Sequence, residues 1–238
     1  MPFRIISLVP SLTELICELG LRDQLVGCTK YCVHPSDLRK SEKITVIGGT
    51  KNIHFDKAEA LAPDLIVANK EENTKEMVEQ LQQKYKVVVT DIKTLDDAEK
   101  ATRELGSIWN LEERAESIIK ANRSALPLRI DQPQRALYLI WRKPWMTIGG
   151  DTYIHDMMRH FGYTNVCGGQ TRYPSLTKED MIRIDPQVVL LSSEPFPFKE
   201  KNIRELKEIL PRADVRLVDG EKYSWYGARL GKIASSPS

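Results

Sequence analysis

Short apolar runs alternate with amphipathic stretches along almost the whole chain. The apolar runs have strand length and lie at residues 3–9, 25–28, 65–68, 87–90, 135–140, 188–191 and 215–218. Between them, apolar residues recur at helical spacing and predict helices at residues 12–19, 74–84, 95–108, 151–161 and 203–210. This alternation of strands and helices is typical of an α/β fold with a mainly parallel sheet.

The first helix has recognisable start and stop signals. Ser11 is followed three residues later by Glu14, which predicts a capping box at the helix start. Gly20 follows the last apolar residue of the helix and predicts its end.

The middle of the chain predicts a longer helix with no strand directly after it. Residues 111–126 keep helical spacing and would span about 24 Å at ~1.5 Å per residue. The helix ends before Pro127, and strand–helix alternation resumes at residue 135. We therefore predict two α/β lobes with mainly parallel sheets, residues 1–108 and 131–238, joined by a single long interlobe helix within residues 109–130.

The two halves share a local pattern. Asp56 and Glu179 each stand seven residues before a proline that precedes an apolar strand. The sequence IGGT at residues 47–50 is matched by IGGD at residues 148–151. Two similar lobes predict a ligand cleft between them.

Composition narrows the class of protein. Of 238 residues, 41% are apolar, enough for a packed core, and the net charge of +2 gives no basic footprint for nucleic acid. No apolar run approaches the ~18 residues of a membrane-spanning helix, which argues against membrane insertion. The first residues show no export signal, which predicts a cytoplasmic protein, or a periplasmic or surface-anchored one if the start is trimmed.

Several motifs appear in an order that resembles the helical-backbone substrate-binding proteins of ABC importers, in the branch that binds vitamin B12 and iron chelates. The matching segments are residues 6–14 (ISLVPSLTE), 26–35 (VGCTKYCVHP), 47–50 (IGGT), 61–68 (LAPDLIVA), 148–151 (IGGD), 185–189 (DPQVV) and 225–229 (WYGAR). The resemblance implies a non-catalytic, monomeric protein that holds a corrinoid, haem or ferric chelate between its lobes and passes it to an ABC permease. It implies no required cofactor beyond this transported, metal-containing ligand.

The ligand-binding residues are inferred from motif position and from the ends of predicted strands. A large flat ligand needs aromatic walls and a few directed polar groups. The aromatic candidates are Tyr31, Trp141, Trp145, Tyr173, Trp225 and Tyr226, and the polar candidates are Thr50, Lys51, Asn69, Lys70, Arg142, Ser193 and Glu194. The family has an aromatic residue where this chain has Asn69, so corrinoid specificity does not carry over wholesale.

Asp56 and Glu179 have a second interpretation through the resemblance. In the family, one acid on each lobe pairs with arginines of the permease, and these two residues fall at the matching positions. The alternative is that each carboxylate only stabilises the positive end of its own helix, by about 0.3–1 kcal/mol.

Cys28, Cys32 and His34 have a spacing short enough for a soft metal ion, but it is not that of a standard zinc site. Buried thiols are the favoured interpretation, so no metal ligand is assigned. Two alternative functions remain: a cytosolic carrier of the same fold without a transporter, and an α/β enzyme. The glycine pairs complete no dinucleotide or P-loop motif, which disfavours the enzyme.

Overall fold

The computed structural model describes residues 3–40, 43–127 and 132–234, and its first part is built on a five-stranded parallel sheet. The strand order is β3–β2–β1–β4–β5. The strands are β1 (Ile5–Ser7), β2 (Leu25–Cys28), β3 (Thr45–Val46), β4 (Leu65–Asn69) and β5 (Val87–Thr90). The order reverses between β1 and β4. In α/β proteins such a reversal opens a crevice at the carboxyl ends of the strands, where ligands bind.

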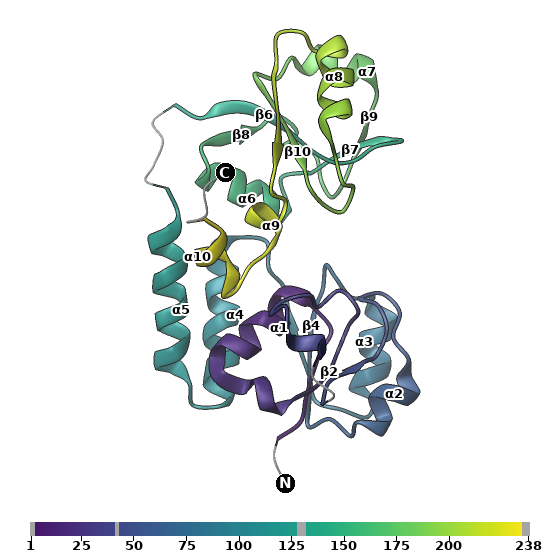
Figure 1. Ribbon diagram of the computed structural model, residues 1–238, viewed down its shortest axis with the longest axis vertical. Coiled ribbons are helices and arrows are strands. Elements are labelled where there is room, and N and C mark those ends of the chain that lie inside the picture. The colour runs from purple at the N-terminus through teal and green to yellow at the C-terminus, as the bar shows by residue number, and fades with distance from the viewer. Residues whose placement is uncertain (1–2, 41–42, 128–131, 235–238) are drawn as a thin grey trace. The chain divides into compact units, whose positions relative to one another are not determined.

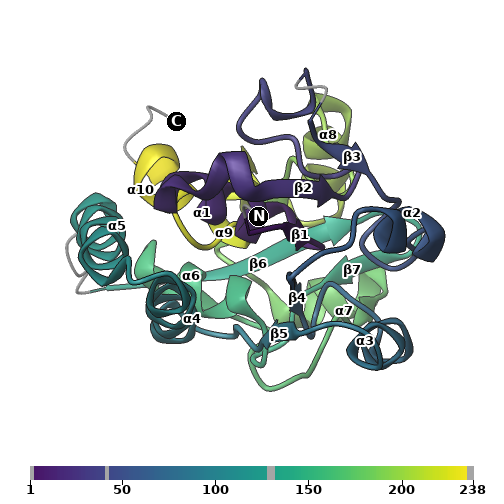
Figure 2. The same ribbon diagram turned by 90° about the horizontal axis from the view of Figure 1, so that it is seen from below.

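Helices cover both faces of this sheet. Figure 2 shows α1 (Pro10–Ile16) on one face, with α2 (Phe55–Ala60) and α3 (Lys75–Gln82) on the other. Every residue of β1 and β4 is consequently buried. Burial on both faces explains why these strands read as continuous apolar runs rather than alternating ones.

The start of α1 differs from the capping-box prediction, which is wrong. The residue before the helix is Val9, no side chain caps the first turn, and Pro10 is the first helical residue. Proline suits this position because the missing N–H would have no helical partner. Glu14 is instead 3% exposed, with one carboxylate oxygen 3.4 Å from the Arg229 guanidinium.

The end of this helical region follows the prediction at Gly20. A π-helical turn, η1 (Cys17–Leu21), follows α1, and Gly20 lies in it with φ +91°. This left-handed backbone favours glycine because it has no Cβ. Short 3₁₀ turns, η2 (Arg22–Gln24) and η3 (Leu38–Lys40), lie before and after β2.

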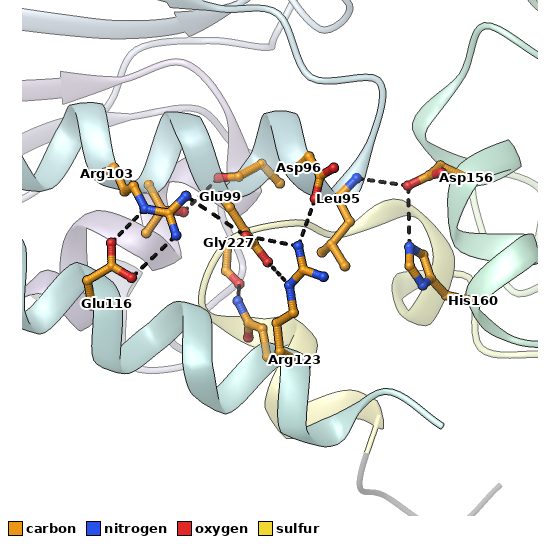
Figure 3. A network of polar contacts seen from close by, with 12 residues as sticks. Leu95, Asp96, Glu99, Arg103, Glu116, Arg123, Asp156, His160 and Gly227 are labelled. Carbon is orange, nitrogen blue, oxygen red and sulfur yellow. Dashed lines mark hydrogen bonds and ion pairs between the residues drawn. The ribbon is translucent and has the colours of Figure 1, made fainter. Parts of the chain in front are cut away.

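Two long helices form an antiparallel pair. Figures 1 and 2 show α4 (Leu95–Ile108) and α5 (Glu112–Ala125) side by side, and both match predicted helices. Ion pairs join them (Figure 3): Arg103 Nε lies 2.6 Å from Glu116, and Arg123 Nε lies 2.5 Å from the buried carboxylate of Glu99. The helix predicted as a lone connector is therefore half of a helical hairpin.

The end of the chain returns to α5. The segment Tyr226–Lys232, which includes the start of α10 (Arg229–Ala234), lies along this helix (Figure 1). The buried Asn122 amide donates to Gly227 O at 2.6 Å, and its oxygen accepts from Gly231 N at 2.9 Å. A single side chain on α5 thus holds two backbone groups of the returning segment.

Contacts divide the chain into two compact units. The first unit comprises the described residues up to Ile92, then Asp96–Arg123 and Tyr226–Lys232. The second comprises Lys93–Leu95, the described residues of the range Ser124–Trp225, and the last described residues from Ile233. This division differs from the predicted boundaries at residues 108 and 131, since most of α5 and the returning segment pack into the first unit.

The second unit contains a mixed sheet of order β11–β10–β6–β7–β9, with β8 also paired to β6. The strands are β6 (Gln134–Trp141), β7 (Trp145–Thr147), β8 (Tyr163–Asn165), β9 (Ser175–Leu176), β10 (Val188–Ser192) and β11 (Asp214–Val218). Strands β6, β8, β10 and β11 are parallel, whereas β7 runs antiparallel to both β6 and β9.

Alternation along β6 and β10 separates two apolar layers. Leu137, Leu139, Val189 and Leu191 belong to a core cluster that also takes residues from α7 (Lys178–Ile184) and α8 (Glu200–Ile209). The side chains in between face the other way, because successive residues of a strand point to opposite faces. That second layer includes Tyr138, whose ring lies 5.1 Å from Tyr223 of α9 (Glu221–Ser224).

Helix α6 (Tyr153–His160) carries a buried carboxylate. Asp156 accepts from Leu95 N at 2.9 Å and lies 3.5 Å from His160 Nε2 (Figure 3), and its other oxygen accepts from Arg159 Nη1 at 3.3 Å. The hydrogen bond from His160 holds the pKa of Asp156 below its usual range, and the backbone donor adds to this effect. The carboxylate thus satisfies one of the backbone N–H groups that the first turn of a helix leaves without a partner.

The internal repeat predicted from the sequence is present in the structure. Helices α2 and α7 each lead into a buried strand, β4 and β10. Ala62 and Asp185, the equivalent residues before the two prolines, both have left-handed backbone, with φ of +41° and +45°. The α/β fold class is confirmed. The prediction missed β3, β7, β8 and β9, which have only two or three residues each.

Candidate functional site

The most exposed of the predicted aromatic residues in the first unit is Tyr31, on the turn after β2. Its side chain is 51% exposed, and the Lys30 ammonium lies 5.1 Å from its ring centroid. A Cβ on Gly49 would lie 3.5 Å from the ring, and Lys30 N donates to Gly48 O at 2.8 Å. The ring therefore lies against the glycine loop that follows β3. We call Lys30, Tyr31, Gly49, Thr50 and Lys51 the Tyr31 patch.

The Asn73 side chain supports the backbone of the Tyr31 patch. Asn73 Nδ2 donates to Thr50 O at 2.7 Å and to Leu8 O at 3.3 Å, while Asn73 Oδ1 accepts from Asn69 N at 2.9 Å. One side chain thus joins the loops after β1, β3 and β4. The sequence analysis missed Asn73, and its only sequence signal is its place four residues after a buried strand end.

Asn69 has a different task from the predicted one. It is 1% exposed, its oxygen accepts from Glu71 N at 2.8 Å, and its Nδ2 donates to Thr90 Oγ1 at 3.0 Å. Because both ends of the amide are used inside the unit, we remove Asn69 from the proposed ligand contacts. Lys70 is exposed, but its ammonium pairs with Asp91 at 2.8 Å.

In the second unit, an aromatic cluster lies where β6 ends. Trp141 is 40% exposed and meets Phe196 edge-on at 5.6 Å between ring centroids. Phe196 in turn meets Phe198 at 4.7 Å, and Phe198 stacks on Trp145 at 6.1 Å. Trp145 is only 6% exposed and belongs to the core cluster. The structure therefore leaves Trp141 as the accessible ring and makes Trp145 a core residue, which corrects its assignment as a ligand contact.

Arg142 forms an ion pair with Glu205 inside the second unit. Its guanidinium forms two hydrogen bonds with the Glu205 carboxylate, one of 2.7 Å from Nε to Oε2 and a shorter one from Nη2 to Oε1. These bonds raise the pKa of Arg142 and lower that of Glu205. The guanidinium also lies 4.7 Å from the Trp145 ring centroid. Its role is to cover the aromatic cluster, and its charge is already neutralised.

A polar group lies at the carboxyl ends of β10 and β11. Ser193 Oγ accepts from Gly220 N at 2.9 Å, and Glu194 accepts from Ser224 Oγ at 2.8 Å. Burial raises the pKa of Glu194, while hydrogen bonds from Ser224 and the Trp225 side chain oppose that rise. Ser193, Glu194 and Trp225 therefore lie together, and Trp225 is only 7% exposed.

Two predicted tyrosines lie apart from these groups. Tyr173 is half-buried on the loop before β9, with the Arg172 guanidinium 5.7 Å from its ring centroid. Tyr226 is 6% exposed and belongs to the first unit, within the returning segment. Its burial argues against direct ligand contact. Two open hollows lie elsewhere, one around Gln132–Gln134 and Phe161–Tyr163, the other around Asn110–Arg114.

The two predicted docking acids occupy equivalent places. Asp56 lies in the first turn of α2 and Glu179 in the first turn of α7, and both are exposed. Neither forms an ion pair with another of the described residues. The neighbouring Asp180 is different, since it accepts from Thr177 N and Oγ1 and pairs with Arg183.

No group of three or more metal-ligating side chains occurs among the residues whose positions are described. Cys28 and Cys32 are fully buried and are not joined by a disulfide. The glycine pairs serve close backbone packing, because a Cβ on Gly150 would overlap Gly168 O. None of the described helices is long and apolar enough to span a bilayer.

Comparison with known proteins identifies the family to which this chain is similar. A family profile described as periplasmic binding protein matches residues 5–213. The ABC transporter substrate-binding lipoprotein YvrC of Bacillus subtilis, itself uncharacterised, is 26% identical over 202 residues, covering 79% of this chain and 63% of that protein. A vitamin B12-binding protein of Pectobacterium carotovorum is 28% identical over 204 residues, covering 82% of this chain and 73% of its own length.

A solved structure shows the same fold. The periplasmic haem-binding protein HutB of Vibrio cholerae matches with a TM-score of 0.80 at 20% identity, over 98% of this chain and 96% of that one. HutB is periplasmic and YvrC is a lipoprotein. The prediction of a cytoplasmic protein is therefore not supported by these relatives.

Proposed function

This chain belongs to the periplasmic binding protein family, and from that membership we propose that it is the non-catalytic solute-binding component of an ABC importer. Its ligand is a metal-containing macrocycle or chelate: a cobalamin-like corrinoid, a haem or a ferric chelate. The relatives support this class, since one is named for vitamin B12 and a structural neighbour for haem.

The observation that carries the proposal is the placement of two exposed aromatic rings. Tyr31 in the first unit comes shortly after β2, Trp141 in the second is the last residue of β6, and their side chains remain 51% and 40% exposed. Exposed rings at the carboxyl ends of strands suit a flat ligand, because ring faces supply large apolar contact at low entropy cost. The Lys30 ammonium beside Tyr31 adds a donor for an acidic group at the ligand rim.

Titration with candidate ligands tests this function. Cyanocobalamin, cobinamide, haem and a ferric catecholate are each added to the purified protein, and binding is measured by calorimetry and tryptophan quenching. We expect saturable binding of at least one of them. For that ligand, Tyr31→Ala and Trp141→Ala are each expected to weaken affinity about 30-fold, the effect of losing a central aromatic contact of ~2 kcal/mol.

Phe3→Ala is the matched control, because Phe3 is also an exposed aromatic (37%) but precedes β1 at the amino end of the sheet. Its affinity should equal that of the wild type. A folded protein that binds none of the four ligands contradicts the proposed ligand class.

Permease docking is a separate prediction. We propose that Asp56 and Glu179 are the acids that contact the transporter. The double variant Asp56→Lys with Glu179→Lys is expected to abolish stimulation of the permease ATPase. Each reversal would place a lysine against the permease arginines with which the acid is proposed to pair. Ligand affinity should stay within about twofold of wild type, since neither side chain belongs to the Tyr31 patch or the aromatic cluster.

The control is Glu76→Lys with Glu208→Lys, which changes the net charge equally at two other exposed acids on α3 and α8. This control should retain ATPase stimulation. Loss of ligand affinity in the Asp56 and Glu179 variant, or equal loss of stimulation in the control, would show that these acids are not docking residues.

A further inference from the structure

A network of buried polar side chains surrounds the sulfur of Cys32 in the first unit. Thr13 Oγ1 lies 3.0 Å and Thr29 Oγ1 3.3 Å from Cys32 Sγ. The Cys28 side chain is also hydrogen-bonded to it. Ser7 Oγ lies 2.7 Å from Thr13 Oγ1 and extends the network. All five residues have an exposed fraction of zero.

This network can direct several protons toward one sulfur. The Thr13 hydroxyl shares its one proton among Cys32 Sγ, Ser7 Oγ at 2.7 Å and Val9 O at 2.9 Å. The Thr29 hydroxyl and the Cys28 thiol can each donate to Cys32 as well. Burial raises the pKa of the Cys32 thiol, but the hydrogen bonds from Cys28, Thr13 and Thr29 outweigh burial and lower the pKa to about 7.

The other cysteines lack this environment. Burial raises the pKa of Cys17 to about 12 and also raises that of Cys167. A nucleophilic thiol needs a stabilised thiolate and access for its partner. The four cysteines should therefore differ strongly in reactivity, and the zero exposure of Cys32 restricts its partners to small oxidants. Cys32 also has a second thiol in contact, which is the usual arrangement for a reversible oxidation.

We propose that Cys28 and Cys32 form a redox-active thiol pair that a small hydroperoxide converts to an intramolecular disulfide, with Cys32 as the attacking sulfur. The Cys32 thiolate attacks one peroxide oxygen; the S–O bond forms, the O–O bond breaks, and the leaving oxygen takes up a proton. The Cys28 sulfur then attacks the Cys32 sulfenic acid, the S–S bond forms, and the hydroxide leaves as water with the Cys28 proton. Two thiols are oxidised as one peroxide is reduced.

The location gives this modification a structural consequence. Residues 29–31 form the turn between the two cysteines, closed by a bond from Cys32 N to Thr29 O at 3.1 Å. That turn carries Lys30 and Tyr31. A disulfide would therefore tie the base of the Tyr31 patch to the end of β2.

Thiol counting on the folded protein tests the proposal. After treatment with hydrogen peroxide, quenching, denaturation and alkylation, the number of alkylated thiols should fall from four to two. Peptide mapping should place the link between Cys28 and Cys32. The variants Cys17→Ser and Cys167→Ser serve as controls and should form the same link. Four remaining thiols, or a link through Cys17 or Cys167, would overturn the proposal.

Two further variants separate the roles of the two sulfurs and their donors. Cys28→Ala should stop at a Cys32 sulfenic acid, which a dimedone probe added with the denaturant traps. Thr29→Val should slow disulfide formation about fivefold at pH 7, the effect of roughly one pKa unit on the thiolate fraction. Thr13→Val supplies the same test if Thr29→Val fails to fold. Unchanged rates in folded threonine variants would contradict the role of the hydroxyl donors.

Discussion

Replacing Trp145 by alanine is expected to lower the free energy of unfolding of the second unit by about 4 kcal/mol. The indole is 6% exposed, stacks on Phe198 with an interplanar angle of 5°, and is covered by the Arg142 guanidinium at 4.7 Å. Its removal leaves a cavity and exposes the Arg142–Glu205 pair. Urea unfolding followed by circular dichroism and by exchange of the β6 and β10 amides measures the loss.

Trp141→Ala is the matched comparison, four residues away in the same hairpin. Trp141 is 40% exposed, and its ring meets the aromatic cluster edge-on at Phe196. Its loss should cost below about 1 kcal/mol, as for exposed side chains in general. Equal destabilisation by both substitutions would contradict the division between a core tryptophan and an accessible one.

Replacing Asn122 by leucine is expected to destabilise the first unit by about 3 kcal/mol. Asn122 is 4% exposed, and its amide satisfies both Gly227 O and Gly231 N. Leucine fills similar space but leaves both backbone groups without this partner, at about 1–3 kcal/mol for each buried group that is left unsatisfied. Amide exchange at Gly231 should accelerate by the corresponding factor, and urea unfolding gives the total.

Lys120→Leu is the control for this experiment, because Lys120 is exposed on the same helix. It should change stability by less than about 0.5 kcal/mol. An Asn122→Leu variant as stable as the Lys120→Leu control would show that the returning segment does not depend on this side chain.

The internal repeat shows which structural features a local sequence pattern can predict. Asp56 and Glu179, each seven residues before a proline, predicted equivalent short helices, and the structure has α2 and α7 at those places with left-handed residues before both prolines. Helix starts, proline positions and strand runs act over a few residues, so one sequence suffices to locate them. The capping box at Ser11 failed because Glu14, although correctly spaced, is drawn into the core beside Arg229.

The candidate site likewise contains residues that local sequence located and residues whose exposure was decided by packing. Ser193 and Glu194 follow β10 and Trp141 ends β6, so strand ends predicted where these residues lie, whereas Tyr31 was identified through its place in the family motif. Trp145 and Tyr226 have equally suggestive neighbours in the sequence, yet the structure buries both. Asn73 was missed because its partners, Leu8 and Thr50, are distant in sequence and are joined only by the fold.

The sequence by itself determined the α/β class, the positions of the long helices and buried strands, and the matching acids of the two repeats. These features arise from periodicity and from residues that are neighbours along the chain. Only the tertiary structure decided which aromatic rings remain accessible, that α5 pairs with α4, and that the end of the chain returns to Asn122. Those outcomes depend on contacts between residues far apart in sequence, where burial and hydrogen-bond satisfaction are settled by packing rather than by local preference.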